Sequence, residues 1–461
     1  MTTPSGFTVE GARVAVVGAA RSGIAAARLL VRRGAAVTLT DVRDFIDEAD
    51  ALREAGVRLE LGGHEPATLT NADLVVLSPG VPPNESAIEA ARRAGVPVIG
   101  ELELASRLLQ GRIVAVTGTK GKSTTTTLAG RMLEAGGHRV LVGGNIGLAL
   151  SAQVDQSTAD TIHVVEASSF QLESTDTFRP WIAVLLNFSP DHLDRHGTVE
   201  AYAAAKRRIF ANQGAGDWAV LNADDARAAA LAQGARSRRV LFSLAAHPDA
   251  EIVVSEGAIV RRSGTAEQPL IPIPEIRLIG RHLVADVLAA AAVSSVVGVA
   301  ADTMRRAAAA FTGLEHALEP IDEIGGVRFV NDSKATNVEA ARLAIESFDA
   351  GLVVIMGGRF KGGRFEDLLE PLRARRAAVV AIGEARPLIR AALGGACPVH
   401  EAADMSSAVR TAFTAAAPGG AVVLAPACAS FDMFRDYADR GRAFKQEVRR
   451  LAEEWKVTRE Q

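Results

Sequence analysis

Strand-like apolar runs alternate with helical patterns along most of this chain. The run RVAVVG is followed by a helical pattern over residues 24–33, and AVTLTD, DLVVLSPG and later runs repeat this order. Such alternation is typical of a mostly parallel sheet with helices on its faces. The order starts again near residue 114 and a third time at VRFVND, and 461 residues are more than one hydrophobic core usually organises. The sequence therefore predicts three α/β domains, which we place at residues 1–102, 103–312 and 313–461.

A glycine-rich turn joins a strand to a helix in the segment VAVTGTKGKSTTTT, residues 114–127. Backbone N–H groups of such a turn can point at phosphate oxygens, while Lys122 can reach the terminal phosphates and Ser123 can bind magnesium. Only Thr119 and Lys120 separate the two glycines, so this phosphate-binding loop is shorter than the usual motif. It predicts ATP binding in a central domain of the P-loop ATPase type. The predicted nucleotide-binding residues of the loop are Gly118, Thr119, Lys120, Gly121, Lys122, Ser123 and Thr124.

A second glycine pattern lies near the N-terminus, where Gly18, Ala20 and Gly23 form G-x-A-x-x-G between a strand and a helix. With Asp41 at the end of the next strand, this arrangement is typical of dinucleotide-binding folds and predicts a Rossmann-like domain. The methyl group of Ala20 stands where a pyrophosphate normally approaches the backbone, which argues against NAD in its usual pose. Two interpretations stay open: a turn without a ligand, or a site for another diphosphate that the turn Ser-Pro-Gly at 78–80 also contacts.

Candidate metal ligands follow the strands next to the P-loop. Glu166 ends a strand, so its carboxylate is expected at the carboxyl edge of the sheet, where it suits magnesium. The loop 187–196, NFSPDHLDRH, adds two carboxylates and two histidines after the next strand. A single histidine is often no more than a satisfied hydrogen-bonding group, but this clustering favours metal or phosphate chemistry. Lys206, on the following predicted helix, receives no role from the sequence alone.

Composition argues against several classes of partner. With 51 basic and 54 acidic residues, the chain has no charge excess that would favour nucleic acid or an acidic membrane. Its two cysteines are too few for a disulfide framework, and the first residues lack a secretion signal, so a reducing cytosol is the expected setting. The longest apolar stretch, 287–301, is short and alanine-rich, which favours a buried helix over a membrane span. We therefore expect a cytoplasmic protein with neither a nucleic-acid partner nor a membrane insertion.

Segments spread over nearly the whole chain resemble, in order, those of the bacterial Mur ligases: TGTKGKST, EASSFQLE, NFSPDHLDRHG with YAAAK, VNDSKATN and LAPACASFD. The last two favour the branch of the family that adds D-glutamate. The resemblance implies the substrates UDP-N-acetylmuramoyl-L-alanine and D-glutamate, a role in peptidoglycan precursor synthesis, a Rossmann-like C-terminal domain and a monomer. ATP would phosphorylate a carboxylate, because a carboxylate is a poor electrophile until one oxygen becomes part of a phosphate. The amine of D-glutamate would then displace phosphate to form an amide.

The resemblance also assigns roles to residues matched one by one. Lys122 would stabilise the transferring phosphoryl group, and Lys206 matches a carbamylated lysine whose carbamate binds magnesium. The implied catalytic residues are Lys122, Glu166, His192 and Lys206. The implied ligands of two magnesium ions are Ser123, Glu166, His192 and Lys206. The implied contacts to the UDP-sugar are Gly18, Ser22, Asp41, Arg43, Ser78, Pro79, Gly80 and Asn145. In the third domain, the implied nucleotide contacts are Asp332 and Lys334, and the implied D-glutamate contacts are Thr336, Lys361, Ser430, Phe431 and Tyr437.

Two positions depart from the family pattern. Leu283 stands where the family has asparagine after Gly-x-His, and Ala317 stands where it has arginine after the histidine at the hinge to the third domain. Neither side chain can hydrogen-bond a base or ribose or place a cation at a phosphate. We therefore expect weaker or altered ATP binding, with Arg281 or Lys120 as hypothetical compensation.

Three other functions stay open. A folate-polyglutamylating ligase shares the short P-loop and the carbamylated lysine, although the full-length N-terminal nucleotide fold argues against it. A non-catalytic sensor of ATP and a UDP-sugar would explain the two departures, but the intact catalytic set argues against it. The interpretation as a dinucleotide oxidoreductase depends only on the first strand-turn-helix pattern.

Overall fold

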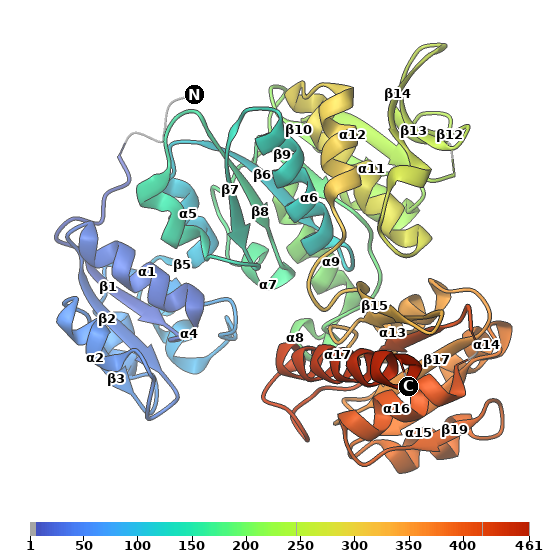
Figure 1. The fold of residues 1–461 in the computed structure, drawn as a ribbon. Helices are drawn as coiled ribbons and strands as arrows, with labels where there is room; N and C mark the ends of the chain where they lie inside the picture. The colour runs from blue at the N-terminus through green and yellow to red at the C-terminus, as the bar shows by residue number, and fades with distance from the viewer. Residues whose placement is uncertain (1–5, 246, 417, 461) are drawn as a thin grey trace. The chain divides into compact units, whose positions relative to one another are not determined.

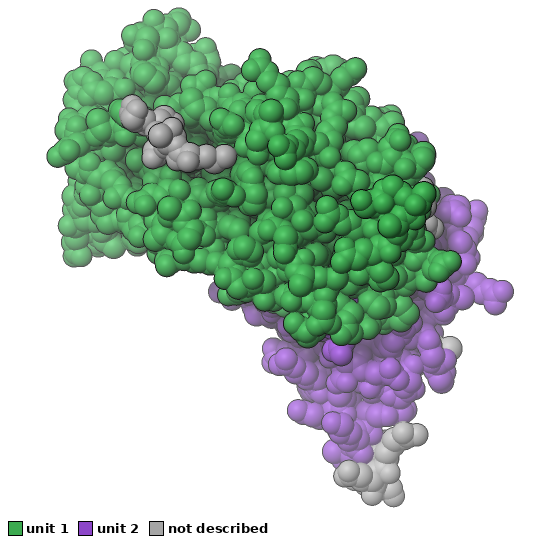
Figure 2. All heavy atoms as spheres, turned by 90° about the horizontal axis from the view of Figure 1, so that it is seen from above, with its two compact units in different colours: residues 1–275, 285–308 green, residues 276–284, 309–461 purple. Residues whose placement is uncertain are grey.

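The computed structural model describes residues 6–245, 247–416 and 418–460 of the chain (Figure 1). It divides into two compact units, one of residues 1–275 and 285–308 and one of residues 276–284 and 309–461, coloured green and purple in Figure 2. The first unit holds two sheets and the second holds one. Most neighbouring strands in all three sheets are parallel, so the predicted α/β fold class is confirmed.

The first sheet is parallel throughout, in the order β3-β2-β1-β4-β5. Its central strand β1 is buried on both faces, because Val14 and Val16 belong to one apolar cluster while Ala15 and Val17 belong to another. The direction of winding reverses between β1 and β4, so the loops after these strands border the crevice where such sheets bind ligands. The strands are β1 (Arg13–Val17), β2 (Ala36–Asp41), β3 (Arg58–Leu61), β4 (Leu74–Leu77) and β5 (Val98–Gly100), and the helices are α1 (Arg21–Arg32), α2 (Ala49–Glu54), α3 (Pro66–Thr70), α4 (Ser86–Arg93) and α5 (Glu101–Leu108).

The second sheet has the order β14-β13-β12-β11-β10-β9-β6-β8-β7 and is parallel from β7 to β12. Because β6 lies between β8 and β9, the loops after these three strands meet at one edge. The strands are β6 (Arg112–Thr117), β7 (Arg139–Gly144), β8 (Thr161–Glu166), β9 (Ile182–Leu185), β10 (Trp218–Asn222), β11 (Arg238–Ser243), β12 (Ile252–Ser255), β13 (Ala258–Ser263) and β14 (Ala266–Pro272). The helical segments are α6 (Lys122–Ala135), η1 (Leu150–Gln156), α7 (Ser169–Leu172), α8 (Leu193–His196), α9 (Val199–Arg207), η2 (Arg208–Phe210), α10 (Ala226–Leu231), η3 (Ile273–Glu275), α11 (Arg281–Val297) and α12 (Ala301–Ala310).

The apolar stretch at 287–301 begins inside α11, as expected for a buried helix. Its residues 287–293 are fully buried. Among the residues that the structure describes, no helix combines the length and the apolar character that a membrane crossing needs.

The third sheet has the order β15-β16-β20-β17-β18-β19, in which only the β15–β16 pair is antiparallel. The last strand of the chain, β20, is inserted between β16 and β17, so the loops after these three strands adjoin one another. The strands are β15 (Glu319–Ile324), β16 (Val327–Asn331), β17 (Leu352–Gly357), β18 (Ala378–Ile382), β19 (Val399–Glu401) and β20 (Ala421–Leu424). The helical segments are α13 (Val338–Glu346), η4 (Phe365–Leu368), α14 (Leu369–Ala374), α15 (Arg386–Leu393), α16 (Met405–Ala415) and α17 (Tyr437–Glu460).

Candidate functional site

The P-loop connects the end of β6 to the start of α6 and depends on its two glycines. Gly118 and Gly121 have φ angles of 155° and 81°, which side chains with a Cβ rarely adopt. A Cβ at position 121 would lie 2.1 Å from Oδ1 of the buried Asp286. Asn187, at the start of the loop after β9, holds the turn from the other side, because its Oδ1 accepts hydrogen bonds from the Thr119 and Lys120 N–H groups at 3.0 and 2.9 Å. The loop is therefore preformed.

Two lysine ammonium groups converge on one carbonyl of this loop. Lys122 Nζ donates to Gly118 O and to Thr119 O, both at 3.0 Å, and Lys206 Nζ donates to Gly118 O at 2.8 Å. These side chains come from the start of α6 and from α9, so the fold joins residues 84 positions apart in sequence, 206 minus 122. Lys122 thus places a cation where a P-loop receives phosphate, and Lys206 lies beside it.

Lys206 is almost completely buried, with 1% of its surface exposed. Its ammonium group also lies 4.7 Å from the ring centre of Tyr202, whose hydroxyl contacts Thr119 Oγ1 at 3.2 Å. Burial lowers the pKa of Lys206 well below its usual value, and the nearby Lys122 lowers it further, whereas Asp191 and Glu166 oppose the shift. At a given pH, the neutral amine form of Lys206 is therefore more populated than that of an exposed lysine.

Glu166 is held by two donors at the end of β8. Ser123 Oγ donates to Glu166 Oε2 at 2.6 Å, and Asn145 Nδ2 donates to Oε1 at 2.7 Å. Asn145, predicted as a contact of the UDP-sugar, thus also orients this carboxylate. Hydroxyl and carboxylate oxygens are ligands that magnesium prefers, and magnesium needs few protein ligands when phosphates supply the others. The described residues contain no group of three or more His, Cys, Asp or Glu that could hold a metal ion.

The two histidines of the loop after β9 differ in exposure. The His192 side chain is 50% exposed, and its Nε2 lies 3.9 Å from Asp191 Oδ2. The His196 side chain is 3% exposed and contacts Ser169 Oγ through Nε2 at 3.0 Å. His196 is therefore a satisfied buried group, whereas His192 is accessible to a ligand. The side chain of Asp194 lies outside what the structure describes.

The predicted N-terminal residues gather at the carboxyl ends of β1, β2 and β4. Asp41 accepts hydrogen bonds from the Ala19 N–H at 2.6 Å and from Arg43 N and Nε, both at 2.9 Å. Burial alone would raise the pKa of Asp41, but the hydrogen bonds from Arg43 and Ala19 lower it to about 2. The buried Ser78 Oγ has no hydrogen-bond partner among the residues that the structure describes. Asp41 thus joins the turn after β1 to Arg43, and its contact with a UDP-sugar stays a prediction.

The remaining predicted contacts lie close to these. Ser22 is partly buried in the first turn of α1, and Pro79 and Gly80 continue the turn after β4.

Gly23 allows α1 to begin directly against β1. A Cβ at this position would lie 1.8 Å from the Gly18 carbonyl oxygen, and that backbone atom cannot move without distorting the turn. We expect Gly23→Ala to destabilise this domain by about 3 kcal/mol, as measured by thermal unfolding. Ala20→Gly is the matched control, because Ala20 is exposed and should change stability by less than about 0.5 kcal/mol. Equal stability of the two variants would contradict the close-contact explanation.

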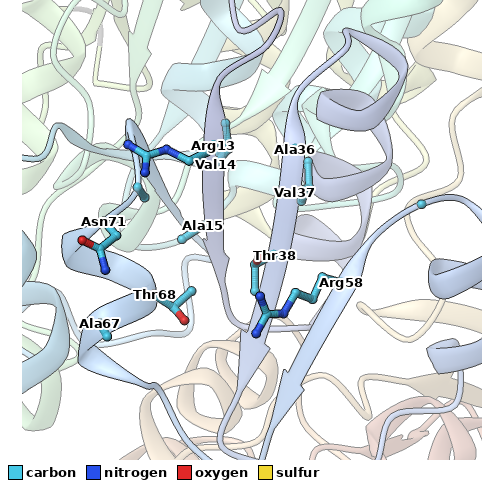
Figure 3. Close-up of a pocket in the computed structure, with 12 residues that line it drawn as sticks. Arg13, Val14, Ala15, Ala36, Val37, Thr38, Arg58, Ala67, Thr68 and Asn71 are labelled. Atoms are coloured by element: carbon cyan, nitrogen blue, oxygen red, sulfur yellow. The ribbon is translucent and has the colours of Figure 1, made fainter.

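A pocket of about 520 Å³ lies elsewhere in this domain, near the opposite ends of the same strands (Figure 3). It is bordered by Arg13 and Arg58, the first residues of β1 and β3, and by residues of α3. Both arginines are already paired, with Asp73 and Glu60 respectively. None of the predicted site residues lines this pocket.

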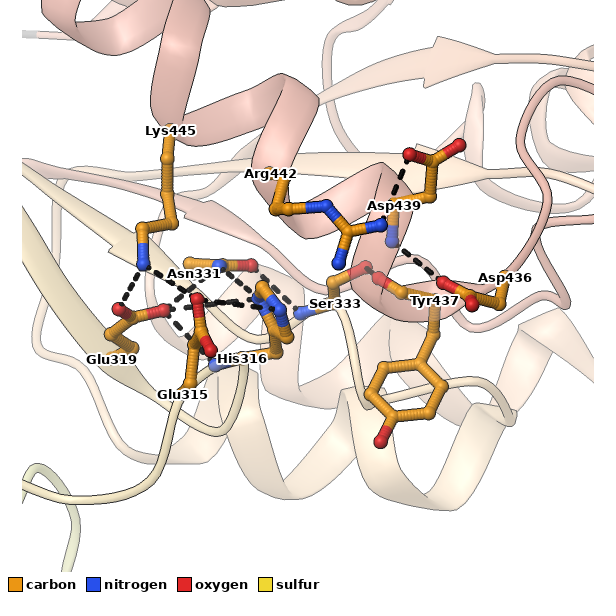
Figure 4. Close-up of polar contacts among 10 residues, drawn as sticks. All are labelled: Glu315, His316, Glu319, Asn331, Ser333, Asp436, Tyr437, Asp439, Arg442 and Lys445. Atoms are coloured by element: carbon orange, nitrogen blue, oxygen red, sulfur yellow. Dashed lines mark hydrogen bonds and ion pairs between the residues drawn. The ribbon is translucent and has the colours of Figure 1, made fainter.

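In the second unit, the loop with His316 is fixed by a polar network (Figure 4). His316, 4% exposed and with φ of 65°, has its Nδ1 2.8 Å from Asn331 Nδ2. Lys445 Nζ points at two carboxylates of the loop and donates to Glu319 at 2.6 Å and to Glu315 at 3.0 Å. Burial lowers the pKa of His316, while both glutamates oppose this shift. These contacts hold the loop that carries Ala317 without any polar group from Ala317 itself.

The residues predicted to contact ATP or D-glutamate in this unit lie on the loops after β16, β17 and β20, except Tyr437, which is the first residue of α17. Backbone bonds join these loops, since Ala427 N donates to Ala335 O and Arg359 N donates to Ala429 O, both at 2.9 Å. Phe431 and Tyr437 are exposed to 63% and 41%, whereas Ser430 is buried. Lys334 and Lys361 are exposed, and Asp332 and Thr336 are partly buried. The fold therefore brings the predicted residues to one edge of the sheet.

Sequence reasoning missed several residues of these sites. Asn187 and Asp286 support the P-loop, and Tyr202 links it to α9. Asn187 and Tyr202 each open a segment that carries the family resemblance, NFSPDHLDRHG and YAAAK, but neither was assigned a role there.

Comparisons with known proteins agree along the whole chain. The Mur ligase MurD-like N-terminal domain matches residues 12–100, the Mur ligase middle domain matches 116–294, and the Mur ligase glutamate ligase domain matches 318–428. UDP-N-acetylmuramoylalanine--D-glutamate ligase of Acidobacterium capsulatum is 47% identical, with 95% of this chain and 96% of that protein covered. The ligase of the same name from Koribacter versatilis is 44% identical, with 97% and 99% covered.

Solved structures show the same fold at low identity. The MurF ligase of Thermotoga maritima, in complex with ADP, has a TM-score of 0.60 at 18% identity and covers 98% of each chain. The UDP-N-acetylmuramate-alanine ligase of Thermotoga maritima has a TM-score of 0.59 at 18% identity, with 95% of this chain and all of that chain covered. The domain matches and the relatives above 40% identity show that the chain belongs to the Mur ligase family, in its branch of UDP-N-acetylmuramoylalanine--D-glutamate ligases.

Proposed function

We propose that this protein is an ATP-dependent ligase that joins D-glutamate to UDP-N-acetylmuramoyl-L-alanine in peptidoglycan precursor synthesis. Its relatives at 41–47% identity bear the name of that activity over nearly their full length. The observation that carries the proposal is the position of the Lys122 ammonium over the Gly118 carbonyl of the P-loop, close to the carboxylate of Glu166 that Ser123 holds. This arrangement is suited to neutralising a transferring phosphoryl group.

In this proposal ATP phosphorylates the alanyl carboxylate, and the D-glutamate amine then attacks the acyl phosphate and releases phosphate. Lys122 interacts with the phosphoryl group, and its hydrogen bonds to two loop carbonyls keep its ammonium over the P-loop beforehand. Ser123 and Glu166 would hold magnesium, which would neutralise phosphate charge. A second magnesium ion would use His192 and a modified Lys206.

Lys206 is proposed to carry a carbamate. A neutral amine attacks carbon dioxide, loses a proton and becomes an anionic N-carboxylate, so the reaction needs an amine with a lowered pKa. Burial of Lys206 provides this condition, and the neighbouring Lys122 favours the anionic product. An unmodified ammonium would instead place a second cation beside the metal ligands.

The remaining assignments are also proposals. Residues 1–102 would bind the UDP-sugar, 103–312 would bind ATP and 313–461 would bind D-glutamate. The protein is proposed to act as a monomer in the cytoplasm, without nucleic acid or membrane insertion. Nearly balanced charge supports the absence of a polyanionic partner.

Phosphate release tests the proposed function directly. The assay contains ATP, magnesium, UDP-N-acetylmuramoyl-L-alanine and D-glutamate, and each component is omitted in turn. Release that requires D-glutamate and is not supported by L-glutamate or L-lysine is the expected result. ATP binding without release would favour a sensor, and activity with a folate substrate would favour the polyglutamylating alternative.

The two departures from the family pattern should affect ATP binding. Leu283 packs against the apolar core of the second unit, and Ala317 lies in the ordered His316 loop, so both replacements are accommodated without a polar group. Arg281, considered as compensation, has a side chain outside what the structure describes. We expect the double variant Leu283→Asn with Ala317→Arg to lower the Michaelis constant for ATP by about tenfold, as one to two hydrogen bonds would. An unchanged constant, or an ordinary one in the parent protein, would contradict this expectation.

A further inference from the structure

Arg440 is a fully buried cation that the reaction described above does not use. It lies in the first turn of α17 and is 1% exposed. Arginine is almost never buried unless its charge is paired. Its partners are therefore informative.

The guanidinium of Arg440 donates to loops that follow three neighbouring strands. Nε donates to Ser333 Oγ at 3.0 Å, and Nη2 donates to Ser333 O at 2.9 Å, after β16. Nη1 donates to Cys428 O at 3.0 Å, after β20, and to Gly357 O at 3.4 Å, at the end of β17. One rigid planar group thus fixes the spacing of three loops.

These loops carry the residues that we propose for D-glutamate and for the nucleotide side of the third domain. Ser333 lies between Asp332 and Lys334, and the loops after β17 and β20 carry Lys361 and Ser430. Ser333 Oγ also donates to the Tyr437 carbonyl at 2.7 Å, which joins the start of α17 to the same network (Figure 4).

The charge of Arg440 is balanced mainly by carbonyl dipoles. No ion pair joins it to a carboxylate within the described part of the chain. Burial lowers its pKa to about 10, and Cys428 and Asp432 oppose this shift, so the group is still protonated near neutral pH. A buried charge without a paired carboxylate is costly, and an apolar side chain could fill the same volume at less cost. The position therefore serves something other than packing.

We propose that Arg440 is a positioning residue for the amino-acid substrate. It holds the loops after β16, β17 and β20 at fixed distances from one another. Its buried positive charge favours a substrate with two carboxylates. This inference rests on the proposed D-glutamate ligase activity.

The test compares Arg440→Gln and Arg440→Lys with Arg450→Gln, an exposed arginine of the same helix that pairs with Glu454. Michaelis constants for D-glutamate, ATP and UDP-N-acetylmuramoyl-L-alanine are measured together with thermal unfolding. We expect the constant for D-glutamate to rise at least about tenfold in Arg440→Gln and less in Arg440→Lys. The constant for the UDP substrate should stay within about twofold, because that substrate is proposed to bind in the first domain.

A purely structural role predicts a different result, with reduced unfolding temperature and turnover but unchanged Michaelis constants. That result would overturn the inference. If Arg440→Gln does not fold, Arg440→Lys and Ser333→Ala carry the test, since Ser333→Ala removes only the acceptor of Nε and one link to Tyr437. Folded variants with wild-type affinity for D-glutamate would refute the proposed role of Arg440 but would leave the proposed ligase function standing. A wild-type protein that does not use D-glutamate would refute the proposed function itself.

Discussion

Lys206→Ala is expected to lower turnover by roughly a thousandfold, the size of effect seen when a preorganised charge is removed from a transition state. Alanine can neither form a carbamate nor contact Gly118 O, where Lys206 Nζ now donates at 2.8 Å. Lys206→Arg distinguishes these two contributions, because arginine keeps a cation but does not react with carbon dioxide. We expect Lys206→Arg to be as inactive as Lys206→Ala in the phosphate-release assay.

The carbamate also has a direct readout. Protein prepared with ¹³C-bicarbonate should give a carbamate carbon signal in the NMR spectrum that is missing from both variants, and a short carboxylate such as acetate should partly restore Lys206→Ala. Lys456→Ala is the control, since Lys456 is exposed on α17 in the other unit. An active Lys206→Arg enzyme would rule out the carbamate and leave Lys206 as a simple cation.

The P-loop edge could be predicted largely because parallel strands end at the same side of a sheet. The order β8-β6-β9 places Glu166 next to Ser123, as the sequence suggested, although the roles of both residues remain predictions. The helix that was predicted to carry Lys206 is present as α9, which η2 follows. The antiparallel strands β13 and β14 were not predicted, because the polar stretch RRSGTAEQ around their turn lacks a clear apolar alternation.

The burial and the partners of polar side chains could not be predicted from the sequence. Arg440 and Ser333 are 107 positions apart, and nothing local to Arg440 distinguishes it from the exposed arginines of the same helix. The same holds for Lys206, whose burial comes from packing of α9 against the P-loop. Only the resemblance to a family pointed to Lys206, since the partners that define such residues are known only once the chain has folded.

Glu166→Gln is expected to reduce turnover by roughly 10²–10³-fold and to raise the magnesium concentration needed for half-maximal activity. Both oxygens of Glu166 accept hydrogen bonds, from Ser123 Oγ and from Asn145 Nδ2. Glutamine keeps the shape but presents an N–H group to one of these donors and loses the negative charge. The loss of turnover should therefore be larger than the loss caused by a Glu→Gln substitution at a position that only accepts hydrogen bonds.

Magnesium titration separates the two consequences of this substitution. If Glu166 binds the ion, excess magnesium should recover part of the turnover of Glu166→Gln. If Glu166 only orders Ser123 and Asn145, added magnesium should have no effect, whereas Asn145→Ala should then be as damaging as Glu166→Gln. Glu200→Gln, an exposed glutamate in the first turn of α9, is the control and should retain the magnesium dependence of the parent protein. A Glu166→Gln enzyme with that same dependence would contradict the assignment of Glu166 as a magnesium ligand.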